Sequence, residues 1–91
     1  MEDPVSQVGG NLEQLTSLKQ KFTTEASDVQ RLKTQITGAI DNTWWIGPAA
    51  ERFKQAWTSD FAPALGRLEQ ALQEAAREVG NREQALRNAG N

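Results

Sequence analysis

The sequence predicts an all-α protein: an antiparallel helix-turn-helix hairpin that dimerises into a four-helix bundle. Apolar residues recur every seven positions along two long segments, and a Gly-Pro pair separates these segments. The chain has 91 residues and no cysteine, so a monomer would bury too little surface to be stable without the association of long helices. We treat residues 1–91 as a single domain.

The first helix is expected over about residues 4–41, because its apolar residues follow a 3.5-residue repeat. The seven-residue series is Val8, Leu15, Phe22, Val29 and Ile36, and the half-steps are Leu12, Leu18, Ala26, Leu32 and Ile40. Asp3 and Pro4 are suited to the N-cap and the first helical position. Gly9 and Gly10 weaken that first turn, so we expect the helix proper from about Asn11 to Ile40, with an extension back to Pro4.

A turn is expected at about residues 42–47, where the periodic pattern stops. Gly47 can adopt backbone conformations that other residues rarely enter. Pro48 suits the first position of a new helix, where its missing N–H has no partner to lose. The chain therefore turns back on itself here and returns antiparallel.

The second helix is expected over about residues 48–88. Leu65, Leu72, Val79 and Leu86 are seven apart, and Phe61, Leu68 and Ala75 lie between them. Pro63 interrupts the pattern, because a proline inside a helix removes a hydrogen bond and clashes one turn back, at about 3 kcal/mol. We expect a kink near Ser59 to Pro63, with helix continuing on both sides.

The apolar side chains are too many for a single facing helix to cover, so we expect two hairpins to share one core. The predicted core residues are Leu15, Phe22, Val29, Leu32, Ile36, Phe53, Trp57, Phe61, Leu65, Leu68 and Leu72. We expect a homodimer, because the apolar residues recur regularly on both helices. No charged residue is expected in the interface between the two helices, which we call the seam. A heterodimer with a similar hairpin stays open.

The composition argues against several classes of function. Without histidine or cysteine, the chain has neither of the usual catalytic nucleophile–base pairs, nor an imidazole or thiolate metal site. We therefore expect no enzyme activity, no cofactor and no metal. The 10 basic and 12 acidic residues are interspersed, which disfavours nucleic-acid binding. No apolar stretch is long enough for stable membrane insertion, and the first ten residues lack the apolar region of a cleaved signal peptide.

Five aromatic residues crowd around the turn, and two interpretations of them stay open. They are Trp44, Trp45, Phe53, Trp57 and Phe61. Large aromatic side chains commonly fill the end of a bundle core. Adjacent tryptophans cannot both face inward, so one of the pair is also a candidate for a surface that contacts a partner.

The turn Trp45-Ile46-Gly47, followed by two alanines, Phe53 and Trp57, resembles the WXG-hundred family of small type VII (ESX) secretion proteins, and its actinobacterial members in particular. The resemblance covers nearly the whole chain. It implies a hairpin that pairs as a homodimer or heterodimer, export by a membrane secretion ATPase without a cleaved leader, and a role as a secreted substrate or co-export partner. Trp45 and Gly47 match the motif that shapes the turn and contributes to export recognition.

The sequence departs from this family at its export signal, a tyrosine followed four residues later by an acidic residue. The chain contains no tyrosine, and Val79 and Glu83 have only the spacing and the acid. Val79 also continues the heptad series of Leu65 and Leu72. The sequence therefore predicts a protein that is cytoplasmic before export and then secreted; the alternative is a cytoplasmic helical scaffold or adaptor that has lost the export signal.

Overall fold

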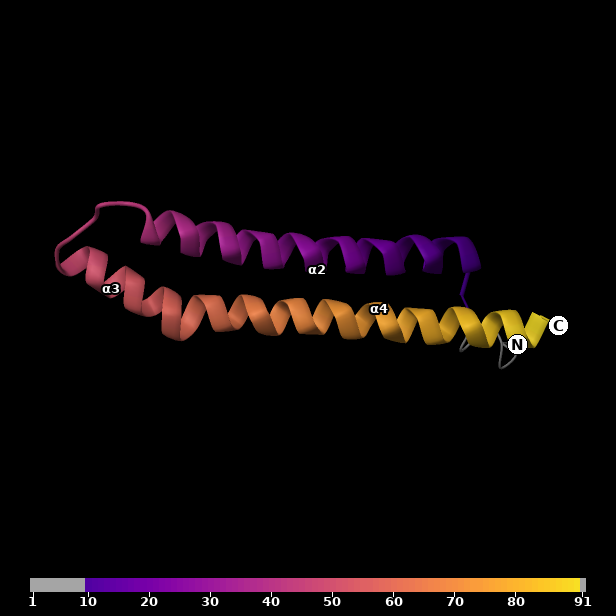
Figure 1. Cartoon of the computed structure of the whole chain (residues 1–91). Helices are drawn as coiled ribbons and strands as arrows, with labels where there is room; N and C mark the ends of the chain where they lie inside the picture. The colour runs from indigo at the N-terminus through magenta and orange to yellow at the C-terminus, as the bar shows by residue number, and fades with distance from the viewer. Residues whose placement is uncertain (1–9, 91) are drawn as a thin grey trace.

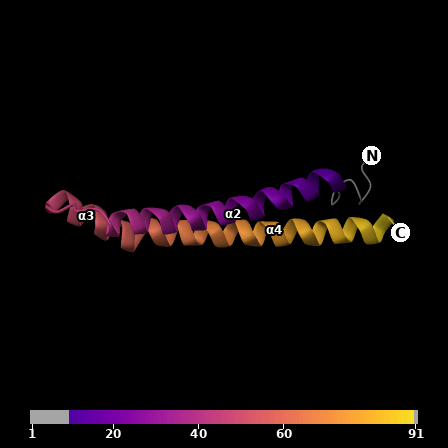
Figure 2. The ribbon, with the colours of Figure 1, turned by 45° about the horizontal axis from the view of Figure 1, so that its top comes forward.

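The chain folds as an all-helical, elongated hairpin in a computed structural model, which describes residues 10–90. Helix α2 (Leu12–Asp41) forms one arm. Helix α3 (Pro48–Ala56), the π-helical turn η1 (Trp57–Phe61) and helix α4 (Ala62–Gly90) form the other arm. The two arms run antiparallel and lie side by side in both views (Figures 1 and 2), with principal extents of 64 × 21 × 15 Å. The predicted helical hairpin is confirmed.

Helix α2 begins at Leu12, next to the expected start of the periodic helix at about Asn11. Gly10 and Asn11 are not helical, and the Asn11 side chain caps the helix by accepting a 2.9 Å hydrogen bond from the backbone N–H of Gln14. The cap explains the start at Leu12, because it satisfies one of the N–H groups that the first turn leaves without a partner. The part of the predicted helix over residues 4–9, with its cap at Asp3, lies outside the described residues.

The chain accommodates Pro63 by widening the helical turn that precedes it. The backbone N–H of Ala62 donates to the carbonyl of Trp57, five residues back, where an α-helix would use the residue four back. Helix continues on both sides of the proline, and Figure 1 shows α3 inclined to the direction of α4. The local distortion is thus a π-turn over Trp57–Phe61, slightly before the position where a kink was expected.

The seam between α2 and α4 is narrow. The buried apolar residues are Ala26, at 3% exposure, and Ala50, which is fully covered. The larger seam residues are only half-buried, and no large side chain in residues 10–90 is fully buried. Two helices alone therefore cover one stripe of each other and leave the flanking positions open to solvent.

Candidate interaction surface

The two sides of the hairpin differ in character. In an antiparallel helix pair, equivalent positions that flank the seam lie on the same side. One flank carries the polar or small residues Thr16, Thr23, Gln30, Thr37, Gly66, Gln73 and Gly80. The opposite flank carries the large apolar residues Leu18, Leu32, Phe61 and Leu68, which we call the apolar side. The other residues at the same repeating position are Glu25, Ala39, Ala75 and Arg82.

The apolar side is well exposed. Leu18 is 42% exposed, Leu32 47%, Phe61 48% and Leu68 46%. Single exposed leucines are ordinary on protein surfaces, but four large apolar side chains at one repeating helix position form a stripe. This stripe is the candidate interaction surface of the hairpin.

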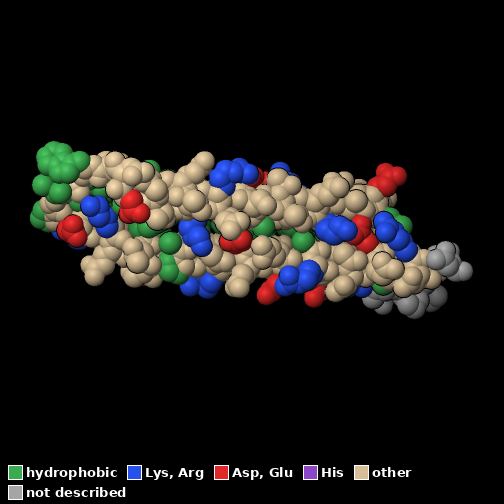
Figure 3. Space-filling model, viewed as in Figure 1, with side chains coloured by type: hydrophobic (Ala, Val, Ile, Leu, Met, Phe, Trp, Pro, Cys, Tyr) green, Lys and Arg blue, Asp and Glu red, His purple; other side chains and the backbone are tan. Residues whose placement is uncertain are grey.

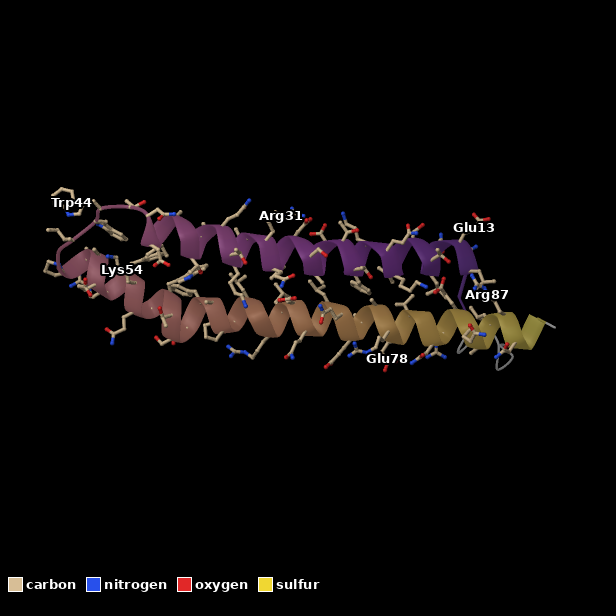
Figure 4. The ribbon with its side chains drawn as sticks, viewed as in Figure 1. Glu13, Arg31, Trp44, Lys54, Glu78 and Arg87 are labelled. Atoms are coloured by element: carbon tan, nitrogen blue, oxygen red, sulfur yellow. The ribbon has the colours of Figure 1, made fainter. Side chains whose placement is uncertain are left out.

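Hydrophobic surface also gathers at the turn end of the molecule (Figure 3). Trp44 is 87% exposed and Ile46 is 68% exposed, and Figure 4 shows Trp44 at the turn end of the hairpin, on the outside of the connecting loop. Trp45 is less exposed, at 39%, because its ring packs 5.8 Å from that of Phe53. Of the two adjacent tryptophans, Trp44 thus lies in solvent and Trp45 packs against α3.

The turn itself depends on Gly47. This glycine has φ 116° and ψ 172°, a conformation that is essentially restricted to glycine. Its carbonyl accepts the first helical hydrogen bond of α3, from Glu51 at 3.0 Å, and Pro48 occupies the first helical position. The Lys54 ammonium donates to the carbonyl of Trp45 at 3.0 Å and thereby ties the loop to α3.

Aromatic rings form a row from the turn to the π-turn. The Phe53 ring lies 6.4 Å from that of Trp57 and 6.3 Å from that of Phe61. The Trp57 indole N–H donates a 2.9 Å hydrogen bond to the Thr37 hydroxyl and so joins the row to α2. The outer edges of Phe53 and Phe61 stay exposed, so the row both closes the turn end and extends the apolar side.

The predicted core residues fall into two groups. Those in the seam are half-buried within the single hairpin: Leu15, Phe22, Val29, Ile36, Trp57, Leu65 and Leu72. Those outside the seam are exposed: Leu32, Phe53, Phe61 and Leu68. The structure therefore brings the first group together by itself and leaves the second group on the surface.

The acid of the candidate export signal, Glu83, lies inside the seam. It is 3% exposed, its carboxylate is 2.7 Å from the Lys19 ammonium, and it accepts a hydrogen bond from the Thr16 hydroxyl. The hydrogen bonds from Lys19 and then Thr16 lower the pKa of Glu83 against the opposing effect of desolvation. Val79 is half-buried in the same seam.

The expectation that no charge occupies the seam is therefore wrong. Glu83 follows Val79 by four residues, and Lys19 follows Leu15 by four residues, so both charges stand at inward heptad positions. The sequence contained this signal as two complementary charges at inward positions of the two arms.

Other surface features are shallow. One hollow, of about 860 Å³, is an open groove on the polar side, lined by residues that include Thr23, Arg77 and Asn81. Within residues 10–90 no group of three or more acidic, histidine or cysteine side chains is arranged to hold a metal ion. No described helix is long and apolar enough to cross a membrane. Comparison of the chain with protein-family models, with curated proteins and with solved structures finds no match.

Proposed function

We propose that this chain is a non-enzymatic protein that acts by helix-bundle association, with its apolar side packed against a second hairpin to form a four-helix bundle. The observation that carries the proposal is the exposure of Leu18, Leu32, Phe61 and Leu68 in a hairpin that fully buries no large side chain within its described part. Covering the exposed half of such a side chain is worth about 1 kcal/mol. Four of them on each hairpin provide a driving force that the single chain leaves unused.

A second copy of the same chain is the partner we propose. The apolar side repeats at the same heptad position on both arms, which suits a two-fold interface in which each hairpin presents the same surface. Light scattering coupled to size-exclusion chromatography on the purified chain tests this choice. A dimer supports it, whereas a chain that is unfolded alone and folds only with a second hairpin protein indicates an obligate heterodimer.

We further propose that the bundle belongs to a type VII secretion system, as a secreted substrate or co-export partner recognised by the secretion ATPase. The support is the resemblance of Trp45-Ile46-Gly47 to the WXG motif, together with its position at the turn of a helical hairpin. Gly47 needs its left-handed conformation for this turn, which gives the glycine of the motif a physical reason.

The second candidate function is a cytoplasmic helical scaffold or adaptor that has lost the export signal. The position of Glu83 favours it, because this carboxylate is bound by Lys19 and Thr16 and is not presented to a receptor. The absence of tyrosine from the sequence favours it as well. Under the first proposal, a partner would have to provide the signal.

Fractionation of the producing cells separates the two candidates. The protein is measured in culture filtrate and in lysate, in strains with and without the secretion ATPase. Export requires its presence in the filtrate of the first strain only, and retention in the lysate of both strains contradicts export and supports the scaffold. Trp45→Ala tests the motif, with Trp44→Ala as the matched control: loss of export in the first variant alone is the expected result.

A further inference from the structure

One arrangement of side chains occurs twice along the hairpin. A β-carbon on Gly80 would lie 3.6 Å from Lys19 Cδ, and one on Gly66 would lie 3.6 Å from Lys33 Nζ. Each lysine side chain therefore reaches a glycine of α4, where no side chain of that position blocks it. Lys33 follows Lys19 by two heptads and Gly66 precedes Gly80 by two heptads, as antiparallel pairing requires.

Only in the Lys19–Gly80 arrangement, near the open end of the hairpin, does a carboxylate bind the lysine. Three residues after Gly80, Glu83 binds Lys19 at 2.7 Å and accepts the Thr16 hydroxyl, and its side chain is almost completely covered. We call Thr16, Lys19 and Glu83 the polar cluster. It places a buried carboxylate and its cation among the apolar residues of the seam.

In the second arrangement, Lys33 over Gly66, no carboxylate binds the lysine within the described residues. Glu69 stands three residues after Gly66, but it accepts a 3.4 Å hydrogen bond from Gln73 on its own helix. Gln30 takes the place that Thr16 has in the first copy. Lys33 makes no hydrogen bond or ion pair within the described part of the chain. The two copies thus provide a natural comparison between a lysine with a carboxylate partner and one without.

The apolar seam alone defines the pairing of the arms poorly. Its residues repeat every seven positions on both helices, so sliding α4 by one heptad along α2 still sets apolar residues against apolar residues. The same slide takes Glu83 away from Lys19 and leaves a carboxylate in the seam without its cation. An unpaired charge in a covered position is strongly unfavourable, so the slide is opposed by Glu83 far more than by the leucines.

We propose that the polar cluster is a register lock: it selects the pairing of α2 with α4 in which Lys19 lies over Gly80 and disfavours pairings slid by one heptad. A single polar position in a heptad interface can fix register at no gain in stability. The inference concerns the pairing of the two arms within one chain and does not depend on the proposed function.

Pairs of introduced cysteines measure the register, because a disulfide forms only between positions that face each other. The natural chain has no cysteine, so no other thiol competes for the link. Thr23 is one heptad after Thr16 and Ala76 is one heptad before Glu83, so Thr23→Cys with Ala76→Cys reports the observed register. Gln30→Cys with Ala76→Cys reports a slide of one heptad. Each pair is oxidised at low protein concentration, and the disulfide within the monomer is identified by mass spectrometry.

In the otherwise natural chain, only the Thr23/Ala76 pair is expected to link. In the background Lys19→Met with Glu83→Met, which keeps an apolar seam and removes the cluster, the Gln30/Ala76 link is expected to appear as well. Lys33→Met is the matched control, because this lysine also lies over a glycine but binds no carboxylate; the observed register should stay exclusive there. Exclusive linking of Thr23/Ala76 in the double methionine background would overturn the proposal.

The charge-reversed background Lys19→Glu with Glu83→Lys decides the question if the double methionine chain loses its helical circular dichroism. The reversed chain keeps an ion pair across the seam, so the register lock predicts Thr23/Ala76 linking alone. Linking of both cysteine pairs in the folded reversed chain would contradict it, because an ion pair would then be present without fixing the register.

Discussion

Substitution of Gly47 by alanine tests whether the turn has the conformation described above. The residue has φ 116° and ψ 172°, a region that is essentially closed to residues with a β-carbon. A β-carbon at this position would meet no atom within 4 Å, so contact with neighbouring side chains contributes nothing to the effect. The loss is therefore backbone strain alone, for which about 1–3 kcal/mol is expected.

Gly38→Ala is the matched control. Gly38 lies in α2 near its end, has ordinary helical backbone, and would also place its β-carbon in open space. Alanine stabilises an exposed helical position by about 0.5–1 kcal/mol relative to glycine. The same substitution at two open positions is thus expected to change the free energy of unfolding in opposite directions.

The assay is chemical denaturation followed by circular dichroism, with all chains at one protein concentration, because association adds to the apparent stability. Gly47→Ala should lower the free energy of unfolding and Gly38→Ala should raise it. Equal or higher stability of Gly47→Ala relative to the natural chain would refute the reasoning. It would mean that the turn does not depend on a conformation specific to glycine.

Two further predictions use the same denaturation assay. Trp57→Phe removes the indole donor to Thr37 and should cost about 1 kcal/mol, whereas Trp44→Phe at the exposed tip should change stability by less than about 0.5 kcal/mol; equal effects would contradict the role of this hydrogen bond. The folded-state pKa of Glu83 is lowered, so its ionised form contributes stability above its ordinary pKa of 4.5, and this contribution is lost as the pH falls through the lower folded value. Glu83→Gln should therefore be less stable than the natural chain at neutral pH and converge with it in acid, while Glu78→Gln, on the outer face of α4 (Figure 4), should differ from the natural chain by less than about 0.5 kcal/mol at neutral pH. A constant difference between Glu83→Gln and the natural chain at every pH would contradict the assignment of that charge.

The hairpin could be predicted from the sequence because its signals are local and repeated. The heptad series of Leu15 to Ile36 and of Leu65 to Leu86 each define one amphipathic helix, and Gly47 with Pro48 separates them. The observed start of α2 at Leu12 agrees with a helix that begins at about Asn11, and the expected extension over residues 4–9 lies outside the described residues.

Two features depend on contacts across the hairpin or on backbone detail and were not foreseen. Pro63 was expected to disturb the helix, but the sequence does not say whether the backbone bends or widens into a π-turn. The burial of Glu83 follows from Lys19, which is distant in sequence and faces it only once the register is known. The sequence identifies Glu83 only as the acid at the spacing of the export signal, whereas the folded hairpin pairs it with Lys19.

Sedimentation equilibrium of the purified chain tests the central claim, association through the apolar side, most directly. The account predicts a species of twice the 10.1 kDa chain mass, which Leu68→Asp weakens and the neighbouring exposed substitution Arg67→Asp leaves largely intact. A cooperatively folded 10.1 kDa monomer at every concentration, equally in the natural chain and in Leu68→Asp, would contradict it.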